Sequence, residues 1–122
     1  MGKQKSLNFI IPLVVYPFDV MISFGETDEQ LKKVMGKYDI EWSENMKVVG
    51  QGLFYMTDLN QSMIRLKKIP ESSEDYGYLH HEIFHAVTYI LNRVGMKLVL
   101  GKSCEAYSYL VGYITTEIYK KL

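Results

Sequence analysis

The stretch Leu79–Val87, LHHEIFHAV, constrains this chain more than any other because it contains the pattern H-E-x-x-H. On a helix, His81 and His85 lie four residues apart on one face, close enough to bind one metal ion together. Glu82 lies beside the first histidine, where a carboxylate can take a proton from water activated by the metal. The pattern therefore requires a helix here, a third ligand and a cleft.

The sequence around this pattern predicts a long amphipathic helix over residues 74–94. Ser72-x-x-Asp75 fits a capping box, and Gly95 is well placed as the first residue beyond the helix end. Apolar residues recur at three- and four-residue steps, at Tyr76, Leu79, Ile83, Val87, Ile90 and Val94. At 100° per residue this stripe points away from the histidines. The helix can therefore pack on a sheet while the histidines face a cleft.

The remaining patterns predict an α+β arrangement of strands and helices. We expect a strand over 18–24, with 8–15 as a further strand or an extended arm. Thr27 and Gln30 fit a second capping box, which opens a helix continuing to Tyr38. A hairpin of strands 47–58 and 63–69 follows, with its turn at 58–62, and a last helix spans 103–121.

Composition narrows the class of protein. The 122 residues are 48% hydrophobic, which predicts one packed domain over 1–122 with 1–6 as a loose terminus. Fourteen basic residues balance 14 acidic ones, so neither a nucleic acid nor a membrane is expected as a partner. The apolar run 7–15 is interrupted by Pro12 and lacks a cleavage site, against a signal peptide. A single cysteine, Cys104, excludes a disulfide framework and favours a cytoplasmic location.

The third metal ligand must be a carboxylate or come from outside the chain. Only three histidines exist, and Thr88 and Leu91 stand where the longer three-histidine pattern has Gly and His. Glu105 and Glu117 are the only acidic residues after the motif helix. If the last helix returns antiparallel to the motif helix, Glu105 comes near the histidines. We therefore predict Glu105 as the ligand and Glu117 as a surface residue.

His81-Glu82-x-x-His85, followed by a helix that opens Cys104-Glu105-Ala106-Tyr107, resembles the gluzincins, the thermolysin-like zinc peptidases. The chain is similar to small metallopeptidase-like proteins of tailed bacteriophages. The resemblance implies a small zincin-like domain, in which a twisted mixed sheet carries an N-terminal helix, the active-site helix and a C-terminal glutamate helix. It also implies Zn²⁺ held by His81, His85 and Glu105. The implied activity is hydrolysis of peptide bonds by a zinc-activated water, with Glu82 as general base.

The same resemblance implies where a substrate binds. The first hairpin strand becomes the sheet edge over the cleft, which maps to 53–57, and a peptide adds to it as an antiparallel strand. Phe54, Tyr55 and Met56 are then the expected contacts with a peptide or protein substrate. A phage-encoded protein of this kind would act in the host cytoplasm.

The sequence also departs from the family pattern. Tyr109 replaces the Asp that orients a histidine, and no downstream histidine stabilises the oxyanion. One of the tyrosines Tyr107, Tyr109 and Tyr113 would have to act instead, and we predict Tyr109 and Tyr113 as catalytic residues. The alternative is a non-catalytic zincin-fold protein with structural or absent zinc, such as a phage structural component or a host-factor binder. His80 is expected to be a packed or solvent-edge histidine rather than a ligand, and Cys104 is expected to be a buried thiol.

Overall fold

The computed structural model describes residues 5–57 and 60–122 as strands and helices in an α+β arrangement. In chain order these elements are β1 (Leu7–Pro12), β2 (Asp19–Phe24), α1 (Asp28–Lys37), the short 3-10 helix η1 (Glu44–Met46), β3 (Gly52–Met56), β4 (Gln61–Leu66), α2 (Ser73–Arg93) and α3 (Cys104–Tyr119). The sequence-based expectation of an α+β fold with a mixed sheet is confirmed. None of these helices is both long enough and apolar enough to cross a membrane.

The sheet has the strand order β1-β2-β4-β3. β1 pairs with β2, and β3 with β4, in antiparallel fashion, whereas the central strands β2 and β4 are parallel. The parallel register runs from Asp19 opposite Gln61 to Phe24 opposite Leu66. β3 is therefore an edge strand. The hairpin of β3 and β4 is followed in the chain by α2.

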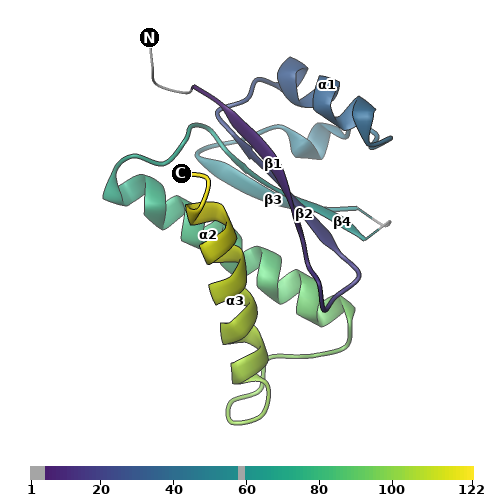
Figure 1. The fold of residues 1–122 in the computed structure, drawn as a ribbon, viewed down its shortest axis with the longest axis vertical. Helices are drawn as coiled ribbons and strands as arrows, with labels where there is room; N and C mark the ends of the chain where they lie inside the picture. Colours follow the sequence, from purple (N-terminus) through teal and green to yellow (C-terminus); the bar gives the residue numbers. More distant parts are fainter. Residues whose placement is uncertain (1–4, 58–59) are drawn as a thin grey trace.

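Two apolar layers cover the two faces of this sheet (Figure 1). On one face, α2 and α3 pack on alternate residues of the strands, such as Val20, Ile22 and Ile64. On the other face, α1 and η1 pack on Met21 and Met63. The alternation along each strand thus sends successive side chains to two separate cores, and α2 is held firmly on one of them.

The ends of α2 follow the local signals in the sequence. The Ser72 hydroxyl accepts from the Asp75 N–H at 3.1 Å, and the Asp75 carboxylate accepts from the Ser72 N–H at 3.1 Å. Gly95 ends the helix with φ of 84°, which favours glycine because that conformation crowds a Cβ atom. The predicted capping box of α1 is also present, between Thr27 and Gln30. Both predicted helix starts are confirmed.

The strands differ in length from the expectation. β3 begins only at Gly52, because irregular backbone over 47–49 and a turn with Gly50 at φ of 82° occupy the start of the predicted strand 47–58. β1 ends at Pro12, so the predicted strand or arm 8–15 is a strand only in its first part. Residues 58–59 of the predicted turn, and 1–4 of the predicted loose terminus, lie outside the described residues.

Candidate functional site

The two motif histidines lie in the middle of α2 with their rings close together. His81 is exposed and His85 is half-buried, and their Nε2 atoms are 3.1 Å apart. The ring planes are inclined at 81°, with centroids 4.7 Å apart. Two nitrogens bound to one tetrahedral zinc ion lie about 3.3 Å from each other, given Zn–N distances of about 2.05 Å. The pair therefore fits two ligand positions on one ion.

Glu82 occupies the flank of α2 that faces β3. Its side chain is only 8% exposed, and a Cβ placed on Gly52 would lie 3.5 Å from its Cγ. Burial raises the pKa of this carboxyl, while the neighbouring His81 and His85 lower it by a smaller amount. Among the described residues no side chain or backbone group donates a hydrogen bond to it. A carboxylate in this state is suited to accept a proton and pass it on.

A groove with a volume of about 560 Å³ runs between α2 and β3. Its lining comes from three elements and comprises Asn45, Gly52, Leu53, Phe54, Tyr55, Met56, Glu82, His85, Tyr89 and Arg93. The predicted substrate contacts Phe54, Tyr55 and Met56 all belong to this lining. Their binding of a substrate stays a prediction. Phe54 and Met56 pack on the α2 side of the sheet, whereas Tyr55 packs on the other side.

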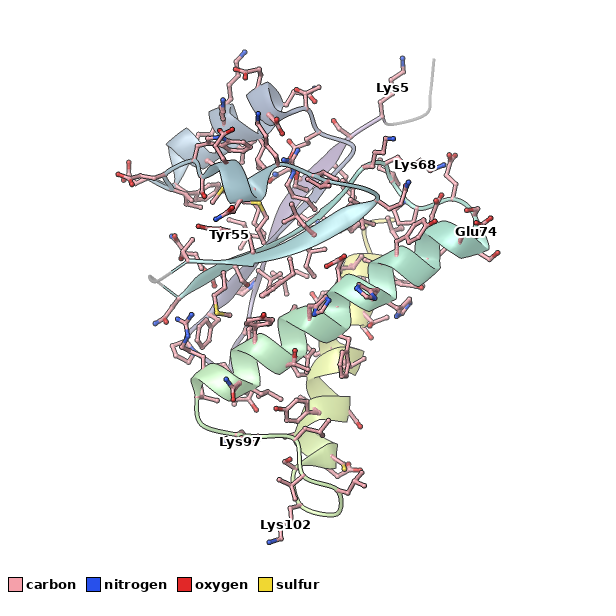
Figure 2. The ribbon with its side chains drawn as sticks, turned by 180° about the vertical axis from the view of Figure 1, so that it is seen from behind. Lys5, Tyr55, Lys68, Glu74, Lys97 and Lys102 are labelled. Atoms are coloured by element: carbon pink, nitrogen blue, oxygen red, sulfur yellow. The ribbon has the colours of Figure 1, made fainter. Side chains whose placement is uncertain are left out.

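The backbone of β3 is available along this groove. Thr57 N donates to Gln61 O, and Lys67 N donates to Gln51 O, at 2.8 Å each. Because hydrogen-bonded and non-bonded pairs alternate in an antiparallel ladder, the N–H and C=O groups of Phe54 and Met56 point away from β4. These groups can pair with an added strand. Figure 2 shows α2 lying alongside β3, with Tyr55 on the opposite side of that strand.

The described arrangement does not bring Glu105 to the histidine pair. The Tyr119 hydroxyl lies 2.9 Å from His80 Nε2, and the Tyr107 hydroxyl donates to Met96 O at 2.7 Å. The two helices are therefore antiparallel, as expected, but Glu105 lies level with the loop beyond Arg93. Within residues 5–57 and 60–122, no three His, Cys, Asp or Glu side chains gather as a metal site. Glu105 as third ligand stays a prediction.

The predicted catalytic tyrosines of α3 lie elsewhere. The Tyr113 hydroxyl donates to Pro12 O at 3.3 Å, at the end of β1, and Tyr109 is 72% exposed. Both line a separate apolar groove with Leu13, Val14, Val15, Tyr16 and Leu110. The reason is their position on the flank of α3 that faces β1, the sheet edge opposite to β3. The structure thus brings neither tyrosine to Glu82.

The other singled-out side chains have local partners. His80 lies on the α3 side of α2, where it contacts Tyr119 and is exposed, in agreement with the expected solvent-edge position. Glu117 pairs with Lys120 at 2.8 Å, which agrees with its expected surface role. Cys104 is partly buried, and its Sγ lies 3.7 Å from Val99 O. None of the three lines the groove between α2 and β3.

Sequence reasoning missed four groove residues, Asn45, Gly52, Tyr89 and Arg93. Two of them had a readable signal, because Tyr89 and Arg93 continue the four-residue spacing of His81 and His85 along one side of the helix. Gly52 permits close approach of β3 to β4, since a Cβ there would meet Leu66 Cδ2 at 2.7 Å and Arg65 O at 2.8 Å.

Comparisons of this chain with protein-family models, with curated proteins and with solved structures found no match. The functional interpretation therefore depends on the residues of this groove and on their geometry.

Proposed function

We propose that this protein is a zincin-like, zinc-dependent peptidase whose active site is the groove between α2 and β3. One observation carries the proposal. The Nε2 atoms of His81 and His85 are 3.1 Å apart, beside a buried carboxylate of raised pKa and along an open strand edge. The histidine pair, the buried carboxylate and the open strand edge each occur alone in proteins without catalytic activity. Together they supply two metal ligands, a proton acceptor and a place for an extended peptide.

Each of the chain's own groups has a role in this proposal. The open edge of β3 binds the peptide backbone as an added strand, which holds one carbonyl near the histidines. Glu82 takes a proton from the attacking water and transfers it to the leaving amine. Tyr89 lines the groove, and its ring centroid is 6.5 Å from that of His85. Its hydroxyl is therefore the group that donates a hydrogen bond to the carbonyl oxygen in this proposal. Zinc, when bound, polarises that carbonyl and acidifies water.

The third ligand is part of the proposal. Glu105 would reach the histidines only if α3 moved along α2, and the other source is a group from outside the chain. Zinc titration of the Glu105→Ala variant decides between them. A loss of affinity of about 10-fold or more supports Glu105 as ligand. Wild-type zinc affinity in this variant would exclude Glu105 as the third ligand and would assign that ligand position to a group from outside the chain.

The catalytic test is the Glu82→Gln variant. We expect it to bind zinc like the wild type and to hydrolyse a peptide library about 10²- to 10⁴-fold more slowly, because it cannot accept the proton. His81→Ala and His85→Ala should lose zinc, whereas His80→Ala, on the other flank of α2, should retain it. Hydrolysis by Glu82→Gln at the wild-type rate would refute the proposed mechanism.

The second candidate is a non-catalytic zincin-fold protein that uses the same groove to bind a partner. It is favoured by one observation, namely that the described residues present no third ligand beside the histidines. This protein would bind peptides with equal affinity in the presence and absence of zinc and would hydrolyse none. Zinc-stimulated hydrolysis that requires Glu82 would exclude it.

A further inference from the structure

The side of α2 that faces the groove continues beyond the histidines. His85, Tyr89 and Arg93 follow one another at four-residue steps and all line the groove. Tyr89 and Phe54 pack together with ring centroids 5.5 Å apart, which forms an apolar wall between helix and strand. Arg93 stands past this wall, in the last turn of α2. The groove therefore has an apolar middle and a basic end.

Arg93 is available to a ligand at this end. It is exposed, and within the described part of the chain no carboxylate pairs with its guanidinium. Some other exposed basic residues have such partners, for example Lys47 with Glu44 and Lys120 with Glu117, but among the described lysines and arginines only Arg93 lines this groove. Among the described residues that line the groove, the ionisable side chains besides Arg93 are the buried Glu82, His85, Tyr55 and Tyr89. A guanidinium binds carboxylates well, because its parallel N–H groups match the two carboxylate oxygens.

The direction of a bound peptide follows from the contacts of β3 with α2. Gly52 adjoins Glu82, and Phe54 adjoins Tyr89, so the strand and the helix run in the same general sense. A peptide that pairs antiparallel with β3 runs the opposite way. Its residues before the scissile bond would then pass over Tyr89 and Arg93. Figure 2 shows α2 extending along β3 towards its Arg93 end, beyond which Lys97 is labelled.

We propose that Arg93 is a specificity-determining residue, which binds an acidic side chain on the N-terminal side of the scissile bond. The proposal rests on the peptidase function proposed above. Arg93 lies eight residues after His85, about 12 Å along the helix axis. An extended peptide advances about 3.3 Å per residue, and the helix crosses the strand at an angle. The acidic residue therefore lies about two to four residues before the scissile bond.

Binding to the Glu82→Gln protein with zinc tests this without hydrolysis. The probes are fluorescent, acetylated and amidated decapeptides of Ala, Leu and Tyr, each with one Glu or, as its pair, one Gln at the same position. We expect the best Glu peptide to bind about 2- to 5-fold more tightly than its Gln pair. Adding Arg93→Gln should abolish this ratio. Lys97→Gln, a matched change outside the groove lining, should preserve it.

The position of the preference tests the assigned direction. Wild-type cleavage of the same peptides locates the scissile bond, and the preferred Glu should lie on its N-terminal side. A preference for Glu on the C-terminal side, or for a free C-terminal carboxylate over an amide, would overturn the proposal. So would a Glu-to-Gln ratio of one, or a ratio that persists in Arg93→Gln.

The two proposals fail in distinguishable ways. A Glu preference that depends on Arg93, without hydrolysis of any peptide by the wild type, overturns the peptidase function and keeps Arg93 as a binding determinant. Hydrolysis that depends on Glu82, without a Glu preference, keeps the peptidase and overturns the role of Arg93.

Discussion

Arg65 and Glu82 are both buried ionisable residues, but their surroundings differ completely. The Arg65 side chain is 2% exposed, and its guanidinium donates to Asp28 Oδ1 at 2.9 Å, Met46 O at 2.8 Å and Glu26 O at 2.8 Å. Glu82 is 8% exposed, yet no donor among the described residues reaches its carboxylate. The Arg65 charge is neutralised by neighbouring protein groups, whereas the Glu82 carboxylate is available to a molecule bound in the groove.

The hydrogen-bond partners of a buried charged side chain, rather than its burial, distinguish a structural residue from a reactive one. A buried charge that its neighbours neutralise stabilises the native state only while every partner remains. Here Arg65 joins the start of α1 and the end of η1 to β4. A buried carboxylate without donors costs stability instead, and proteins retain such groups mainly where reactivity requires them. Four substitutions test this contrast, and they are given in order of decreasing predicted change in stability.

Arg65→Met should give the largest loss of stability. The change keeps an apolar stem but leaves the carbonyls of Glu26 and Met46 without their donor and Asp28 without its ion pair. We expect the free energy of unfolding to fall by about 3 kcal/mol, measured by urea denaturation. Lys67→Met, an exposed change just past β4, should stay within about 0.5 kcal/mol. An equal effect of the two changes would contradict the structural role of Arg65.

Gly52→Ala should have the second largest effect, because it acts on the contact between β3 and Glu82. The new methyl would lie 2.8 Å from Arg65 O, a backbone atom with little freedom to move. We expect a loss of about 2 kcal/mol together with weaker peptide binding, as β3 is pushed outwards. Gly77→Ala on α2 meets nothing within 4 Å and should instead stabilise by about 0.5–1 kcal/mol. Unchanged stability in Gly52→Ala would show that the strand does not lie this close.

Asp75→Asn tests a buried carboxylate that has donors. The N–H groups of Ser72 and Glu71 lower the pKa of Asp75 below its ordinary value of 3.8. A lowered folded-state pKa adds stability above the ordinary pKa, and this contribution is lost as pH falls through the folded value. The variant should therefore melt at a lower temperature than wild type at pH 7, and this difference should shrink as pH falls through the lowered folded-state pKa of Asp75. A difference that is constant with pH would contradict the charge effect.

Glu82→Gln should have the smallest effect on stability and the opposite sign. Because burial raises the folded-state pKa of Glu82 above its ordinary value of 4.5, the native state loses stability as pH rises through the folded value. Gln avoids this cost, so the metal-free variant should be more stable than wild type by up to about 1 kcal/mol at pH 7. The difference should vanish near pH 4 in thermal scans. A destabilised variant at pH 7 would mean that the Glu82 carboxylate has a donor after all.

The features that sequence predicted well depend on residues close together in the chain. The capping boxes at Thr27 and Ser72 and the glycine cap at Gly95 each involve residues within about four positions. The placement of His81 and His85 on one exposed side of α2 followed from helical periodicity. Such signals need no knowledge of the rest of the fold.

The position of α3 along α2 could not be predicted from the sequence, because it depends on how two helices pack against each other. The apolar stripe of α3 repeats every turn, so packing of Leu110 and Ile114 on α2 is compatible with several registers, each shifted by about 5.4 Å. The observed register takes Glu105 past the end of α2. The expectation of Glu105 at the histidines assumed another register, and nothing in the stripe could distinguish the two.

The order of elements along the chain also bears on how the molecule folds. Every groove residue except Asn45 comes from residues 52–93, where β3, β4 and α2 follow one another without interruption. The central parallel pair instead joins Asp19 to Gln61, across about 40 residues. Contacts between near neighbours close loops of low entropic cost and form early, whereas distant pairings form late. Loop closure alone therefore favours contacts within the contiguous segment 52–93 over the pairing of β2 with β4.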